Sequence, residues 1–296
     1  MVKIGGILFV IVNFVFDSIL LTWLFILLYS ITHLGNHTTQ HLSQDYFYYV
    51  GFGLNGGIAL LALMPFSHHL IKLFTNSRTL LVNEQNKIRP LLNEVLQQAQ
   101  IQGKLLQEPT VLISDKKLAY AKALGTTTII FTSGLLNSDG EELKAVLAQQ
   151  LGYIYHKGGV VLLTVMFTSG IMYILQYLYK VYHLIGSSIA KILGTGSIVW
   201  YLLDLVLIIF FSPIIILNWV RVQLINLGFV LVFNRYDYLA DKFACDIGYR
   251  IGLISYLDKL RMLHKPKANF SGQVLAKQTS PIKRIRKLEN ISSPQN

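Results

Sequence analysis

The polar residues Gln149, Gln150 and Tyr153 stand in an otherwise apolar segment that also contains Leu147 and Leu151. The apolar residues recur at helical spacing, so the three polar positions fall at i, i+1 and i+4, on or beside one helix face. Amide and phenol groups form hydrogen bonds, but a neutral amide cannot act as a general base. The simplest prediction is that they satisfy one another in a pocket, and a non-catalytic peptide-binding cleft is the functional alternative.

The same three positions carry the chemistry of the zinc motif H-E-x-x-H. There, two imidazoles hold the metal and the intervening Glu takes a proton from the metal-bound water. In this chain both imidazoles and the carboxylate are replaced, and a Gln amide is a poor zinc ligand. We therefore expect no catalytic residues here, and no zinc or other cofactor.

Two other places could hold a metal. A displaced zinc site could use Tyr153, His156 and Asp237. His156 is too far along the helix from Gln149 for the two residues to share one ion. The simpler interpretation of His156 is a surface histidine. Three histidines recur at every fourth residue of a polar loop and would share a face if that loop were helical: His33, His37 and His41.

The composition is typical of an integral membrane protein. Of the 296 residues, 53% are hydrophobic and only 14% are charged, and the mean hydropathy is +0.49. A helix needs about 20 apolar residues to cross a bilayer. Four segments meet this requirement and predict four transmembrane helices: residues 4–29, 48–66, 159–178 and 198–219.

The distribution of Lys and Arg predicts the orientation. Residues 30–47 contain neither, whereas the segment after the second span is rich in both, so the two termini and the central region are expected in the cytoplasm. Lys180 and Lys191 depart from this rule. Asp17 and Asp204 lie inside predicted spans, where a charge is costly, and should face the bundle interior beside partners such as Asn13 or Asn55.

The net charge of +11 fits attraction to anionic lipid, with the basic run at residues 283–287 against the inner leaflet. No groove-reading motif accompanies this charge, so a nucleic-acid partner is not expected. The single cysteine, Cys245, excludes an internal disulfide and suits a reducing cytoplasm.

The polar region between spans two and three predicts a small α+β domain. A helix is expected over residues 80–102, interrupted by Pro90, and a strand over residues 110–114. A capping box of Ser138 and Glu141 is expected to start the helix that carries Gln149, Gln150 and Tyr153, which we call the polar triad. A second β-rich run is expected to be an edge strand that accepts an extended polypeptide. Its residues are Thr126, Thr127, Thr128, Ile129, Ile130 and Phe131.

The order of several motifs resembles that of the HtpX-type membrane zinc metallopeptidases. Ala119-Tyr120-Ala121 resembles the family's edge-strand segment N-A-F-A, residues 129–136 resemble a strand entering its T-x-G-L-L turn, and residues 142–148 resemble the start of its active-site helix. After two spans, residues 237–241 resemble E-Y-x-A-D, whose Glu is the third zinc ligand, and residues 279–288 resemble its H-P…R-I…L tail. The chain differs from the family's pattern at the three zinc ligands and the general base, where it has Gln149, Gln150, Tyr153 and Asp237.

The resemblance implies an α-helical polytopic membrane protein with a cytoplasmic α+β metallopeptidase-like domain. Its segments would be residues 1–75 (two spans), 76–158 (peptidase-like region), 159–219 (a transmembrane hairpin) and 220–296 (cytoplasmic helices and a basic tail). We interpret it as a pseudoprotease of the cell inner membrane, linked to protein quality control, that binds or assembles membrane-protein or unfolded polypeptide segments, alone or in a larger membrane complex. The alternatives are an active zinc metalloendopeptidase with a displaced metal site, and a transport or structural subunit that uses only the spans.

Overall fold

The structure is a computed structural model, and contacts divide the chain into two compact units. It describes residues 2–32, 43–64, 67–170, 216–262 and 280–290, and the single positions 177, 184, 188 and 205. The first unit contains Met1–Ile7, Ala62–Leu163 and Leu227–Asn296, and the second contains Leu8–Leu61 and Thr164–Asn226. The division into four segments expected from the sequence stays a prediction.

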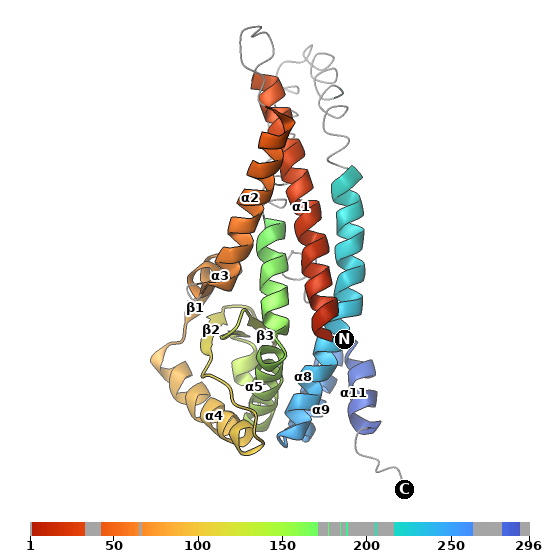
Figure 1. The fold of residues 1–296 in the computed structure, drawn as a ribbon. Helices are drawn as coiled ribbons and strands as arrows, with labels where there is room; N and C mark the ends of the chain where they lie inside the picture. The colour runs from red at the N-terminus through yellow and green to blue at the C-terminus, as the bar shows by residue number, and fades with distance from the viewer. Residues whose placement is uncertain are drawn as a thin grey trace. The chain divides into compact units, whose positions relative to one another are not determined.

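The first unit combines a small sheet with several helices (Figure 1). Its strands are β1 (Ser77–Thr79), β2 (Thr110–Ser114), β3 (Ala121–Leu124) and β4 (Thr128–Thr132). Its helices are α3 (Ser67–Thr75), α4 (Val82–Ile101), the short 3-10 turn η1 (Leu135–Asn137), α5 (Gly140–Tyr155), α8 (Asn234–Asp246), α9 (Arg250–Met262) and α11 (Pro281–Asn290).

The strands lie in the order β1-β2-β4-β3. Strands β2 and β4 are parallel, with Ile113 opposite Phe131, and β3 is antiparallel to β4, with Lys122 opposite Ile130. Both central strands are rich in β-branched and aromatic residues and almost fully buried, as expected of interior strands. The expectation of an open edge at residues 126–131 is therefore wrong, because β4 pairs on both sides. Among the described strands, β1 and β3 are the edges.

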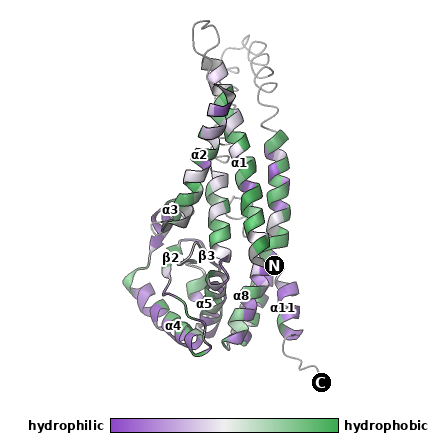
Figure 2. Ribbon diagram, viewed as in Figure 1, coloured by the Kyte–Doolittle hydropathy of each residue, from purple (hydrophilic) through white to green (hydrophobic). Residues whose placement is uncertain are grey.

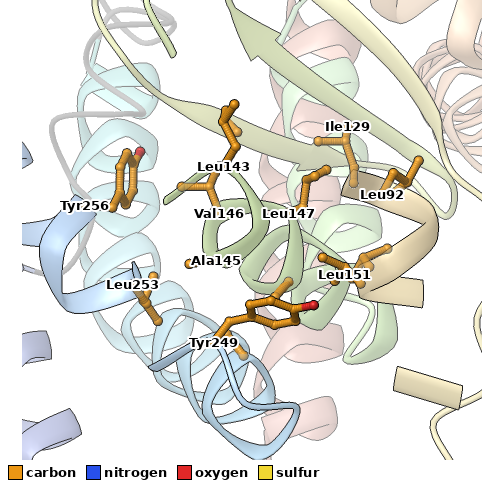
Figure 3. Close-up of a cluster of buried hydrophobic side chains, with 14 of the residues drawn as sticks. Leu92, Ile129, Leu143, Ala145, Val146, Leu147, Leu151, Tyr249, Leu253 and Tyr256 are labelled. Carbon is orange, nitrogen blue, oxygen red and sulfur yellow. The ribbon is translucent and has the colours of Figure 1, made fainter. Parts of the chain in front are cut away.

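Helix α5 runs through the core of the first unit. Its apolar face packs against residues from α4, β4 and the segment around α9 (Figure 3). At Gly152 the helix meets α8 so closely that an added Cβ would lie 2.8 Å from the Ala240 Cα. The core residues of α5 are Leu143, Ala145, Val146, Leu147, Ala148 and Leu151. This packing fixes the polar triad at the contact between α5 and α8.

Some local expectations are corrected by the structure. The capping box at Ser138 is wrong, because α5 begins at Gly140 with Asp139 as its N-cap and no side-chain cap bond. Pro90 does not interrupt its helix, since α4 continues from Val82 to Ile101. The strand at residues 110–114 is confirmed as β2. Part of the predicted polar tail is helix α11.

Two described helices are long and apolar enough to cross a membrane, Ile4–Ile26 within α1 (Val2–Thr32) and Ile216–Asp246, which contains the π turn η2 (Phe229–Phe233) and α8. Figure 2 shows the apolar character of α1 along its length. The second predicted span forms α2 (Gln44–Leu63) without meeting the same criterion. The third is described to the end of the apolar helix Gly158–Gly170, and most of the fourth lies outside the described residues.

The second unit buries a polar network inside its helices. Asp17 is fully buried and forms an ion pair with Arg221, a partner that the sequence did not indicate. Asn13 was expected beside Asp17, and its Nδ2 donates to Asp17 Oδ2 at 2.8 Å. Asn55 instead donates to Ser18 Oγ, at 3.0 Å. Asp204 lies outside the described residues.

Candidate functional site

The three polar residues of α5 are buried, and the two amides, Gln149 and Gln150, are hydrogen-bonded in a chain. Gln150 Nε2 donates to Gln149 Oε1 at 3.2 Å, and Gln149 Nε2 donates to Asp241 Oδ1 of α8 at 2.8 Å. Gln150 Oε1 accepts the backbone N–H of Ala123 in β3 at 2.8 Å. Mutual satisfaction by hydrogen bonds was therefore right for the two amides, and the network extends to α8 and β3.

The carboxylate of Asp241 joins three helices. Arg284 of α11 donates from Nε to Asp241 Oδ2 at 2.7 Å and from Nη2 to Oδ1, while Gln149 approaches from α5. Burial raises the pKa of Asp241, and Arg284 opposes that effect. Asp241 lies four residues after Asp237, one helical turn further along α8. That spacing was the available signal, but sequence reasoning singled out only Asp237.

A buried lysine stands beside Tyr153. Lys122 of β3 has 8% of its surface exposed, and its Nζ lies 4.6 Å from the centroid of the Tyr153 ring, a cation–π contact. Burial lowers the pKa of Lys122, and the charge of Asp237 opposes that effect. Tyr153 Oη has no hydrogen-bond partner among the described residues. No local sequence pattern indicated this contact, because Lys122 and Tyr153 come from segments far apart in the chain.

The outward edge of β3 is partly closed. Thr132 N donates to Tyr120 O at 3.1 Å. In this register the backbone N–H and C=O groups of the even-numbered residues of β3 point toward β4, and those of the odd-numbered residues point outward. The outward N–H of Ala123 is taken by Gln150, and that of Gly125 donates to Gly159 O at 2.9 Å. All four residues of β3 are buried, and both of these outward N–H groups already have partners within the chain.

Zinc does not fit the residues present at the motif positions. Zinc sites use thiolate, imidazole or carboxylate ligands with free lone pairs. The oxygens of Gln149 and Gln150 already accept hydrogen bonds, and Lys122 brings an ammonium group against the ring of Tyr153. Asp237 is the one carboxylate retained at a ligand position. This arrangement holds a polar interface together, and the neutral Gln150 stands where the motif has its Glu base.

The remaining predicted residues are placed as follows. His156 follows the last residue of α5 as its C-cap, and its ring meets Tyr155 edge-on with centroids 5.1 Å apart. In the part of the chain that the structure describes, no group of three or more His, Cys, Asp or Glu residues could hold a metal ion. The displaced site stays untested, and His33, His37 and His41 lie outside the described residues.

Comparison with known proteins matches the chain to a family model and to solved structures. The model of peptidase family M48 matches residues 83–292. Among solved structures, the crystal structure of Ste24p from S. mikatae is similar, with 15% sequence identity and a TM-score of 0.47. That match covers 90% of this chain and 62% of the Ste24p chain, so the protein spans less than two thirds of its length. No curated protein matches the sequence.

Proposed function

The chain belongs to peptidase family M48, and on that premise we propose that it is a member without hydrolytic activity that acts as a binding or assembly factor for membrane-protein segments. The proposal concerns the part of the fold that in an active peptidase would meet the substrate, namely α5, α8 and the edge strand β3. These elements are retained in this chain, while the chemistry at their contact has changed.

The observation that carries the proposal is the closed network at the motif positions. Hydrolysis by a zinc peptidase needs a metal that lowers the pKa of bound water and a base that takes its proton. Here Gln149 links α5 to Asp241, Gln150 links α5 to β3, and the buried Lys122 stands against Tyr153. Gln149, Gln150 and Tyr153, the three motif positions of α5, thus each contact another element.

The β3 edge is the surface we propose for polypeptide recognition. Strand addition needs backbone groups that face away from the sheet, and in β3 those belong to the odd-numbered residues Ala121 and Ala123. An entering segment would exchange its own carbonyl for the Gln150 oxygen at the Ala123 N–H. This exchange replaces one hydrogen bond by another, so binding would be reversible and sensitive to the segment's neighbouring side chains.

We further propose that the protein lies in the cell inner membrane as a multi-pass protein, with its peptidase-like unit and both termini in the cytoplasm. Support comes from the two apolar helices and from the absence of Lys and Arg in residues 30–47. A Cys245-free background with one cysteine placed at position 40 tests this orientation. Labelling of that cysteine from the cytoplasmic side alone would contradict it.

The test of the missing activity combines metal content with cleavage. We expect the full chain, purified without chelator and reconstituted in vesicles, to contain no stoichiometric zinc and to leave an unfolded membrane protein intact. One zinc per chain that is lost in His156→Ala or Asp237→Ala, together with chelator-sensitive cleavage, would establish the displaced metal site instead.

The test of binding uses a photo-crosslinking aromatic residue at Tyr120, immediately before β3, and the same residue at the exposed Leu105 as the matched control. An unfolded membrane-protein segment reconstituted with the protein should crosslink at Tyr120 and not at Leu105. Equal crosslinking at the two positions would show that the β3 edge is not the recognition surface.

A further inference from the structure

A pocket of about 220 Å³ lies between α8 and α11 in the first unit. Four of its eight lining residues are cationic, and one, Asp241, is anionic. Asp241 is already neutralised by Arg284, with both side chains buried. The cations that remain are Arg235, Lys242 and Lys287, and none of the three has an ion pair within the described ranges of the chain.

The three cations are placed by two facing helices. Arg235, Tyr238 and Lys242 stand at i, i+3 and i+7, so they share one face of α8. Lys287 reaches across from α11, and its Nζ lies 3.7 Å from the centroid of the Tyr238 ring. The Asp241–Arg284 pair holds the two helices together beneath the pocket. The cations are therefore gathered around a preformed hollow and are not simply spread over the surface.

The pocket begins where the apolar part of its helix ends. Arg235 is the first charged residue after the run Phe229–Phe233 in the helix Ile216–Asp246. The start of the other apolar helix reaches the same level, because an added Cβ at Gly6 would lie 2.6 Å from Tyr236 Oη. In the multi-pass orientation proposed above, on which this step rests, the pocket would lie at the depth of the lipid headgroups.

We propose that this pocket binds the phosphate of an anionic phospholipid headgroup. Three ammonium or guanidinium groups that lack carboxylate partners suit a phosphate diester, and Arg235 can donate two hydrogen bonds in parallel. The volume is several times that of a water molecule, which takes about 30 Å³ of the liquid, so a phosphate group has room. The proposal is independent of whether the protein hydrolyses peptides.

The test measures binding of a short-chain phosphatidylglycerol to the full chain in a neutral detergent. Phosphatidylcholine of the same chain length and inorganic phosphate are the parallel arms. The pocket variant is Arg235→Gln with Lys287→Gln. The matched control is Lys283→Gln with Arg286→Gln, which removes the same charge from exposed positions of α11 that do not line the pocket.

We expect the pocket variant to bind phosphatidylglycerol about tenfold or more weakly, and the control to change its affinity by less than about twofold. A Lys242→Gln variant, changed at one exposed position, provides a second measurement if the double variant folds poorly. Equal loss in the pocket and control variants would overturn the proposal in favour of diffuse charge. Wild-type affinity for inorganic phosphate equal to that for phosphatidylglycerol would overturn the lipid assignment.

Discussion

Rebuilding the zinc ligands should give only weak zinc binding while Lys122 remains. The perturbation is the variant Gln149→His, Gln150→Glu, Tyr153→His and Asp237→Glu, made with and without Lys122→Ala. The Lys122 ammonium contacts the ring that a ligand imidazole would replace, and so it stands beside the intended metal. Zinc would have to tolerate that charge or displace its proton.

The free-energy cost of each route decides whether zinc would bind beside the charged Lys122 or displace its proton. A single charge and a doubly charged zinc 4.6 Å apart, the distance from Lys122 Nζ to the Tyr153 ring centroid, repel by about 7 kcal/mol at an effective dielectric constant of about 20. Removing the proton from a lysine with the ordinary pKa of 10.5 costs about 5 kcal/mol at pH 7. Burial lowers the pKa of Lys122, so deprotonation is the easier route and its cost is smaller still. We expect Lys122→Ala to tighten zinc binding by roughly 100-fold, which corresponds to about 3 kcal/mol.

The assay is competition for zinc with a chromogenic chelator at pH 7 and pH 9, on purified protein in detergent. Lys122 holds its proton below its folded-state pKa, so the gap between the two variants should be widest at the lower pH and shrink as the pH rises. The ligand histidines are common to both variants and cancel in the comparison. The control is the quadruple variant with Lys117→Ala, at an exposed position, in place of Lys122→Ala. Equal zinc affinity with and without Lys122, at both pH values, would refute the reasoning.

Two further predictions concern stability. Gly152→Ala should lower the free energy of unfolding by about 1–3 kcal/mol in denaturant titrations, because the new methyl group meets the backbone of Ala240. The control is Gly140→Ala at the start of the same helix, where the methyl group enters open space and should not lower the free energy of unfolding. Arg221→Met leaves Asp17 buried without its ion-pair partner and should cost about 3–5 kcal/mol. Thermal unfolding in detergent should show that adding Asp17→Leu restores most of that loss, and no recovery in the double variant would contradict the pairing.

The frame of the site could be predicted from the sequence, because its elements have strong periodic signals. Helix α5 follows from apolar residues at helical spacing, and β2 and β4 follow from short runs of β-branched residues. Strand β3 reads Ala-Lys-Ala-Leu and lacks that composition, so only the resemblance of residues 119–121 to an edge-strand segment indicated a strand there. The order of the strands in the sheet could not be predicted from the sequence either. Strand β4 lies between β2 and β3, although β3 precedes it in the chain.

The contacts inside the site were harder to predict than the elements. Lys122 and Arg284 look like surface cations in the sequence, and only the fold shows that each is buried against a partner from a distant segment. Arg284 was expected at the lipid surface with its basic neighbours, whereas it pairs with Asp241. Long-range pairing of this kind leaves no local pattern, so sequence periodicity carries no information about it.

The hydrogen-bond chain through Gln149, Gln150 and Asp241 also makes these three positions depend on one another. Gln149→His would remove the amide that donates to Asp241, and Gln150→Glu would remove the amide that donates to Gln149. Each of these single substitutions would break a buried contact, and neither would by itself supply the full H-E-x-x-H ligand set. Substitutions in one network do not act independently. In the inactive state that we propose, each single substitution toward H-E-x-x-H would therefore be opposed by the loss of a hydrogen bond until the other substitutions are in place.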